Sequence, residues 1–113
     1  MSENKLTYFD KFLTEKLSKY PLYSQEHTPT DHVIVSVRFM HLYKTVNWWI
    51  TEYNPETKIA FGYVTWLFED EWGYISIEEL AESSGVVIQD YFPPMKFSTV
   101  KNTFLSEWGE ELL

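Results

Sequence analysis

The chain has 113 residues, which is enough for one domain with a modest core and too few for two. Its residues are 44% hydrophobic and 19% aromatic, which excludes intrinsic disorder over most of the chain, and the absence of cysteine excludes disulfides and thiolate metal sites. The formal net charge of −8 argues against direct binding to the phosphates of nucleic acid.

The first element is an amphipathic helix, predicted over residues 5–19. Hydrophobic side chains recur there at spacings of three and four, with charged residues between them: Leu6, Phe9, Phe12, Leu13 and Leu17. Pro21 disfavours helical geometry in the residue before it and so ends the helix. The following PLYSQEHTPTD segment is rich in turn-forming residues and is predicted to be an ordered loop.

Five strands follow. The segment HVIVSVRFM alternates apolar and polar positions and is rich in β-branched residues, which is typical of a strand. The run IAFGYVTWLF is apolar on both faces and is therefore predicted to be central in its sheet, with the acidic EDEWG segment forming the next turn. The predicted strands are 32–40, 47–53, 59–68, 72–77 and 86–92.

Two further helices complete the prediction. Ser76 and Glu79 have the spacing of a capping box and predict a short helix near 78–84, and Ser98 or Thr99 is placed to cap a C-terminal helix over 98–112. The expected fold is α+β, a single domain over 1–113 with a four- to five-stranded, mainly antiparallel sheet and helices at its ends.

The sequence also bears on location. The N-terminus MSENKLTYFD lacks the uninterrupted apolar segment of a signal peptide, and IAFGYVTWLF is too short to cross a bilayer as a helix. We therefore expect a soluble, cytoplasmic protein.

Negative charge is concentrated in residues 61–95, which contain no lysine or arginine. Six of the carboxylates fall in two groups: Glu69, Asp70 and Glu71 in the predicted turn, and Glu78, Glu79 and Glu82 on the predicted short helix. Because residues three and four apart share a helical face, Glu78 or Glu79 lies on the same side as Glu82.

Catalytic and metal chemistry find little support. The acids lack the alternating spacing and glycine of a calcium loop, and Glu69, between Trp66 and Trp72, is the best candidate for a carboxylate with a raised pKa. The histidines His27, His32 and His41 form no metal-binding pair. No nucleophile elbow, phosphate-binding loop or dinucleotide fingerprint occurs, so we expect neither enzyme activity nor a cofactor.

Three segments occur in an order that resembles a small bacterial family, the domain of unknown function numbered 2958. They are LYSQEHTPTDHVIVSVRF at 22–39, FGYVTWLFEDEWGYISIEEL at 61–80 and VIQDYFPPMKFSTV at 87–100. The resemblance covers about 21–100, while the helix at 5–19 and the tail beyond residue 100 depart from the family pattern. It implies an origin in bacteria, plasmids or phages and transfers no catalytic residue.

These observations favour a non-catalytic interaction module that carries its acids toward a protein with a basic surface. A fixed array of carboxylates displaces phosphates from a basic groove, so the hypothesis is an inhibitor or accessory factor, encoded by a phage or plasmid, that mimics nucleic acid charge. The partner-binding residues are then Glu69, Asp70, Glu71, Trp72, Glu78, Glu79 and Glu82. The alternatives are a merely solvated acidic surface, self-association, and a ligand-binding or catalytic pocket lined by aromatic residues between the sheet and the N-terminal helix.

Overall fold

The computed structural model describes residues 2–105, with side chains from residue 4 onward. Its centre is a twisted, five-stranded antiparallel sheet in the order β5-β4-β3-β2-β6. The strands are β2 (Val37–His41), β3 (Val46–Asn54), β4 (Ile59–Trp66), β5 (Glu69–Ser76) and β6 (Val86–Ile88). The predicted α+β fold with a mainly antiparallel sheet is confirmed, and β4 is an inner strand as its apolar sequence indicated.

The predicted strand 32–40 is wrong as a single element. It is divided into β1 (Ile34–Val35), which pairs with β7 (Met95–Lys96) in a small second sheet, and β2, which pairs with β3. Val35 and Val37 would share a face in an unbroken strand, but they belong to different hydrophobic clusters. The break at Ser36 therefore lets the two valines pack on opposite sides of the molecule.

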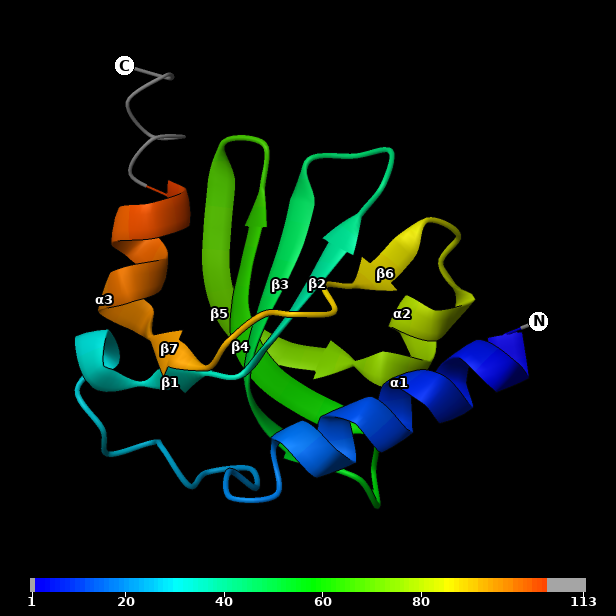
Figure 1. The fold of residues 1–113 in the computed structure, drawn as a ribbon, viewed down its shortest axis with the longest axis horizontal. Coiled ribbons are helices and arrows are strands. Elements are labelled where there is room, and N and C mark those ends of the chain that lie inside the picture. Colours follow the sequence, from blue (N-terminus) through cyan, green and yellow to red (C-terminus); the bar gives the residue numbers. More distant parts are fainter. Residues whose placement is uncertain (1, 106–113) are drawn as a thin grey trace.

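Helices cover both faces of the central sheet (Figure 1). On one side lie α1 (Ser2–Lys16) and α2 (Ile77–Glu82), and their cluster includes Phe9, Leu13 and Leu17. On the other lie the 3-10 turn η1 (Thr30–His32), α3 (Phe97–Val100) and a π-helical turn η2 (Lys101–Leu105). Trp48 packs against the α1 cluster and Trp49 is buried in the α3 cluster, as alternation along a strand requires.

The ends of the helices differ in how well their sequence signals hold. The capping box is confirmed, because the Ser76 hydroxyl accepts a 3.2 Å hydrogen bond from the Glu79 amide. The α1 helix ends at Lys16, earlier than predicted, and a turn carries the chain to Pro21. The C-terminal helix begins at Phe97, and the predicted part at 106–112 lies outside the described residues.

A β-bulge divides β3 and decides which side chains reach each face. Ile50 opposes Gly62 and Glu52 opposes Phe61, so Thr51 is the extra residue. The chains approach closely here: a Cβ atom on Gly62 would stand 2.2 Å from the Trp49 carbonyl oxygen. The glycine is therefore what lets β4 pass the bulged strand.

Candidate functional site

The first group of acids lies on a strand and not in a turn, which corrects the sequence prediction. The β4–β5 hairpin turns through Leu67 and Phe68, and Glu69, Asp70 and Glu71 are the first residues of β5. All three side chains are exposed, and β5 is an edge strand. Charged side chains on an edge oppose pairing with another strand, so the acids have a structural use here whatever they bind.

The three acids point to both faces of the sheet. Glu69 and Glu71 oppose Trp66 and Val64, and Asp70 opposes Thr65 on the other face. The Trp66 indole donates a 2.9 Å hydrogen bond to the Glu69 carboxylate. Glu69 is thus exposed and paired, and it is not the buried acid that its position between two tryptophans suggested.

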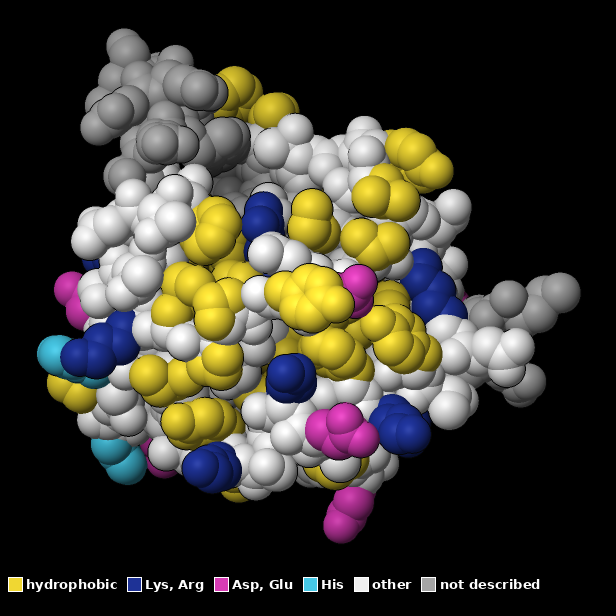
Figure 2. Space-filling model, viewed as in Figure 1, with side chains coloured by type: hydrophobic (Ala, Val, Ile, Leu, Met, Phe, Trp, Pro, Cys, Tyr) yellow, Lys and Arg dark blue, Asp and Glu magenta, His cyan; other side chains and the backbone are white. Residues whose placement is uncertain are grey.

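The second group lies beyond the other end of β5. Glu78, Glu79 and Glu82 are exposed on α2, which begins immediately after Ser76, the last residue of β5. On the face seen in Figure 2, acidic side chains are few and scattered, while hydrophobic ones gather over its middle. The structure therefore places the six predicted carboxylates in two separate groups, at opposite ends of one strand.

Trp72, predicted as an anchor for a partner, is half-buried in the α3 cluster. Its ring centroid lies 4.8 Å from that of Phe97 and 5.1 Å from that of Tyr63. Packing against α3 is therefore its principal role, and the exposed apolar side chains lie elsewhere on the hairpin.

The turn of the hairpin, Leu67 and Phe68, forms an exposed apolar tip that the sequence analysis missed. Their exposed fractions are 55% and 68%, and Leu67 adopts a φ of +47°. This left-handed backbone is disfavoured for any residue with a Cβ atom, because Cβ comes too close to the following carbonyl oxygen. The strand predicted over 59–68 ends at Trp66, and nothing in IAFGYVTWLF marks its last two residues as a turn, because both are apolar.

The hairpin tip is held beside the neighbouring loop. The Leu67 amide donates a 3.1 Å hydrogen bond to the Thr45 carbonyl, in the connection between β2 and β3. That connection also exposes Leu42 and Tyr43. One end of the sheet therefore combines apolar side chains at two loop tips with the acids that begin β5.

A cavity of about 340 Å³ lies against the opposite face from α1, between strands β3–β5 and the loop that follows α1. Four aromatic rings, two carboxylates, several polar side chains and one valine line it: Tyr23, Phe61, Trp72, Tyr74, Glu26, Glu52, Gln25, Thr28, Thr30, Thr51 and Val33. An aromatic pocket was one alternative from the sequence, but this cavity is formed by the loop and includes no residue of α1.

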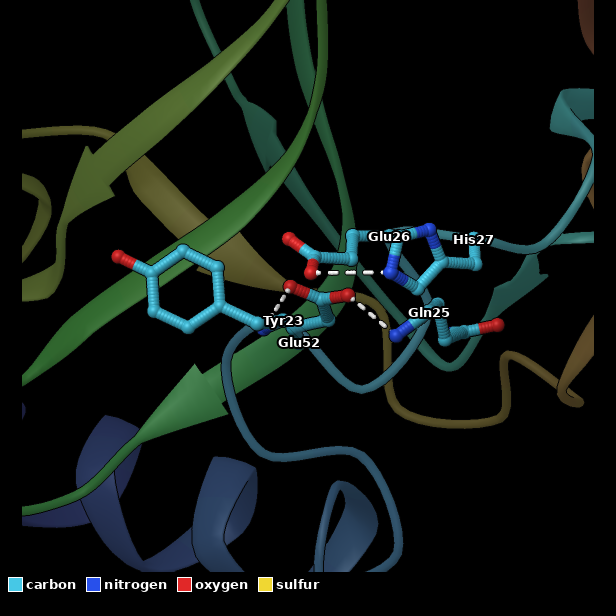
Figure 3. Close-up of polar contacts among 5 residues, drawn as sticks. All are labelled: Tyr23, Gln25, Glu26, His27 and Glu52. Carbon is cyan, nitrogen blue, oxygen red and sulfur yellow. Dashed lines mark hydrogen bonds and ion pairs between the residues drawn. The ribbon is translucent and has the colours of Figure 1, made fainter.

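Glu52 is the buried charge of this cavity, with a side chain only 5% exposed. One carboxylate oxygen accepts a hydrogen bond from the Tyr23 amide and the other from the Gln25 amide, both at 2.8 Å (Figure 3). Tyr23 has a φ of +74°, so the carboxylate holds the loop in a left-handed turn. Glu26 lies beside it, with its carboxylate 3.4 Å from Nε2 of the exposed His27, a contact that is an ion pair when the imidazole is protonated.

Arg38 fastens the C-terminal turn to the sheet. Its guanidinium lies 4.7 Å from the Trp49 ring and 5.0 Å from the Phe104 ring, and it donates hydrogen bonds to Asn47 and Gln89. Burial lowers the pKa of this arginine. The ring stacking and the hydrogen bonds stabilise its positive charge, which has no carboxylate partner among residues 4–105.

The described part of the chain contains neither a metal-binding cluster nor a membrane-spanning helix. Its histidines and acids form no group that could hold a metal ion, and none of its helices has both the length and the hydrophobicity to cross a membrane. His41 uses its Nδ1 to accept a hydrogen bond from the Tyr43 amide, which is a local turn contact.

Comparisons of the chain with protein-family models, with curated proteins and with solved structures find no match. The resemblance to family 2958 therefore stays a prediction, and the function has to be argued from the site itself.

Proposed function

We propose that this protein is a non-catalytic interaction module of the cytoplasm that uses the β4–β5 hairpin to bind a basic, nucleic-acid-binding protein. In this proposal it acts as an inhibitor or accessory factor encoded by a phage or plasmid. The hairpin tip supplies the apolar contact, and Glu69, Asp70 and Glu71 supply negative charge in the place of phosphates.

The observation that carries the proposal is the backbone of Leu67. A left-handed leucine costs about 1–2 kcal/mol relative to an ordinary backbone conformation. Here that cost accompanies two apolar side chains turned outward, where they gain little from burial in the free protein. Strain of this kind is typical of binding and switch regions.

Charge decides the chemistry of the partner. The carboxylates of Asp70 and Glu71 form no hydrogen bond or ion pair with other described residues, so both are available to lysine or arginine side chains. Apolar contacts at the centre of an interface contribute most of the affinity, while surrounding charges set specificity and the rate of association. A basic groove with an apolar floor fits both features.

The test compares two variants of equal net charge. Glu69→Gln, Asp70→Asn and Glu71→Gln neutralise the hairpin, and Glu78→Gln, Glu79→Gln and Glu82→Gln neutralise α2. Each immobilised variant is incubated with bacterial lysate, and proteins released by rising salt are quantified against wild type. We expect nucleic-acid-binding proteins to be lost from the hairpin variant and kept by the helix variant. Equal loss from both variants would mean that binding depends on the overall negative charge of the protein and not on the hairpin.

A further inference from the structure

Two carboxylates, Glu26 and Glu52, line the cavity, and Glu52 forms no ion pair with a described residue. None of its lining residues is a lysine, arginine or histidine. The two amides that bind the Glu52 carboxylate neutralise it only in part, because each oxygen retains a lone pair. Burying a carboxylate in this way is costly unless a cation is present for at least part of the time.

The backbone directs this carboxylate into the cavity. Without the bulge at Thr51, Glu52 would share a face with Ile50 and would point into the α1 core. The extra residue reverses the alternation, so Glu52 lies across from Phe61 on the face where the cavity opens. Bulges that re-aim one side chain are common beside functional sites.

Aromatic rings form the other wall. Phe61 and Trp72 are stacked with an interplanar angle of 14°, and Tyr74 meets Phe61 edge-on at a centroid distance of 5.2 Å. The pKa of Tyr74 is raised by its hydrogen bond with Tyr23, and also by the negative charges of Glu52 and Glu26. The carboxylates and the aromatic wall therefore line the same cavity.

We propose that this cavity binds a small organic cation, an alkyl-guanidinium or alkyl-ammonium group, with its charge at Glu52 and its stem along the aromatic wall. The faces of aromatic rings attract such cations electrostatically and also cover their apolar stems. The volume of about 340 Å³ suits one small molecule or one long side chain. The same chemistry is offered by a free amine and by an arginine or lysine of another protein.

A pair of matched probes tests the charge requirement. Butylguanidinium and butylurea have nearly the same shape, and only the first is charged. Each is titrated into the protein while the indole N–H of Trp72 is followed by two-dimensional NMR. We expect butylguanidinium to shift this signal in a saturable way and butylurea to bind at least about tenfold more weakly. Equal binding of the two probes, or no saturable shift with either, would overturn the proposal.

Two variants separate binding from folding. Glu52→Gln retains the shape and one acceptor but removes the charge, and it should weaken butylguanidinium binding by about tenfold or more. Tyr74→Ser removes an exposed part of the wall and so leaves the fold intact, with Tyr91→Ser, at a tyrosine that is 94% exposed, as its control. Loss of binding in Tyr74→Ser but not in Tyr91→Ser supports the site, and unchanged binding in Tyr74→Ser contradicts it.

A third probe identifies the source of the cation. The tripeptide acetyl-Gly-Arg-Gly-amide presents the same group on a peptide backbone. Binding as tight as that of butylguanidinium assigns the cavity to an arginine of a partner protein, whereas binding of butylguanidinium alone assigns it to a free cation. The hairpin tip does not line the cavity, so Leu67→Gly should leave butylguanidinium binding unchanged.

Discussion

The Trp66 indole N–H donates a hydrogen bond to the Glu69 carboxylate across the last pair of the β4–β5 hairpin. This bond ties the first of the three acids to the strand that precedes it, while Asp70 and Glu71 have no such partner among the described residues. The hairpin is thus fixed directly beside its turn, so the apolar tip and the carboxylates of Asp70 and Glu71 project from a defined position.

Replacing Leu67 by glycine should separate stability from binding. Glycine adopts a positive φ without strain, but it raises the entropy of the unfolded chain, so the free energy of unfolding should rise by up to about 1 kcal/mol. Binding to the partner should fall because half of the apolar tip is lost. Urea denaturation and quantitative capture measure the two effects.

Lys58→Gly is the matched control for that variant. Lys58 also has a positive φ, +58°, but it lies in the turn between β3 and β4. This turn precedes β4, whereas Leu67 follows β4 at its opposite end. It should show the same gain in stability with capture unchanged. Equal loss of capture in both variants would mean that backbone relaxation, and not the apolar tip, governs binding.

The paired glycines of β4 and β5 should respond in opposite ways to alanine. Gly62→Ala should lower the free energy of unfolding by about 1–3 kcal/mol or more, because the new methyl group meets the Trp49 carbonyl. Gly73 lies directly opposite, with nothing within 4 Å of a Cβ atom, so Gly73→Ala should be neutral or stabilise by about 0.5 kcal/mol. Similar losses at both positions, in urea denaturation, would contradict the close approach at the bulge.

The environment of Tyr53 predicts that the free energy of unfolding falls in alkaline solution. Burial and a 2.6 Å hydrogen bond to Asp10 raise its pKa in the folded protein well above the usual value of about 10. The unfolded chain therefore releases this proton first, so the stabilisation is complete below pH 10 and falls above it, by up to about 1.4 kcal/mol per pH unit.

The corresponding measurement is urea denaturation between pH 9 and 11. Tyr53→Phe should flatten the decline above pH 10, and Tyr91→Phe, at an exposed position, should leave it as in wild type. An unchanged slope in Tyr53→Phe would show that other groups cause the alkaline loss.

Neutralising the α2 acids and removing the apolar tip should affect different rate constants for the partner. Neutralising Glu78, Glu79 and Glu82 removes charge outside the proposed contact, so association should slow while the dissociation rate stays within about twofold. Phe68→Ser removes a direct contact and should mainly speed dissociation. Surface plasmon resonance with a captured partner distinguishes the two, and faster dissociation in the α2 variant would place α2 inside the interface.

Local signals in the sequence were sufficient for much of the fold. The strand predicted at 47–53 and the Ser76–Glu79 spacing depend on neighbours in the chain, and both appear in the structure, as β3 and as the capped start of α2. The break at Ser36 and the short β6 were not predictable in this way. In β6, pairing stops after the Gln89 amide reaches the Arg38 carbonyl, and the chain then turns away.

The candidate sites depended on contacts between distant segments. The acidic residues of EDEWG favoured a turn at 69–73. In the structure Gly62 pairs with Gly73, and this register of β4 against β5 places the turn at Leu67 and Phe68. Nothing in NWWITEY distinguishes Glu52, because only the bulge beside the Ile50–Gly62 pair directs its side chain toward the cavity. A bulge set by a partner strand leaves no signal in the strand that contains it.

Competition with DNA tests the hairpin proposal most directly. A partner captured on wild-type protein, and not on the hairpin variant, is purified and mixed with fluorescently labelled duplex DNA at fixed salt. Mimicry of nucleic acid charge predicts that this protein displaces the DNA, that Phe68→Ser displaces it less well, and that Tyr91→Ser matches wild type. A ternary complex, in which the DNA stays bound as this protein is added, would contradict the proposal that the hairpin occupies a nucleic-acid-binding groove.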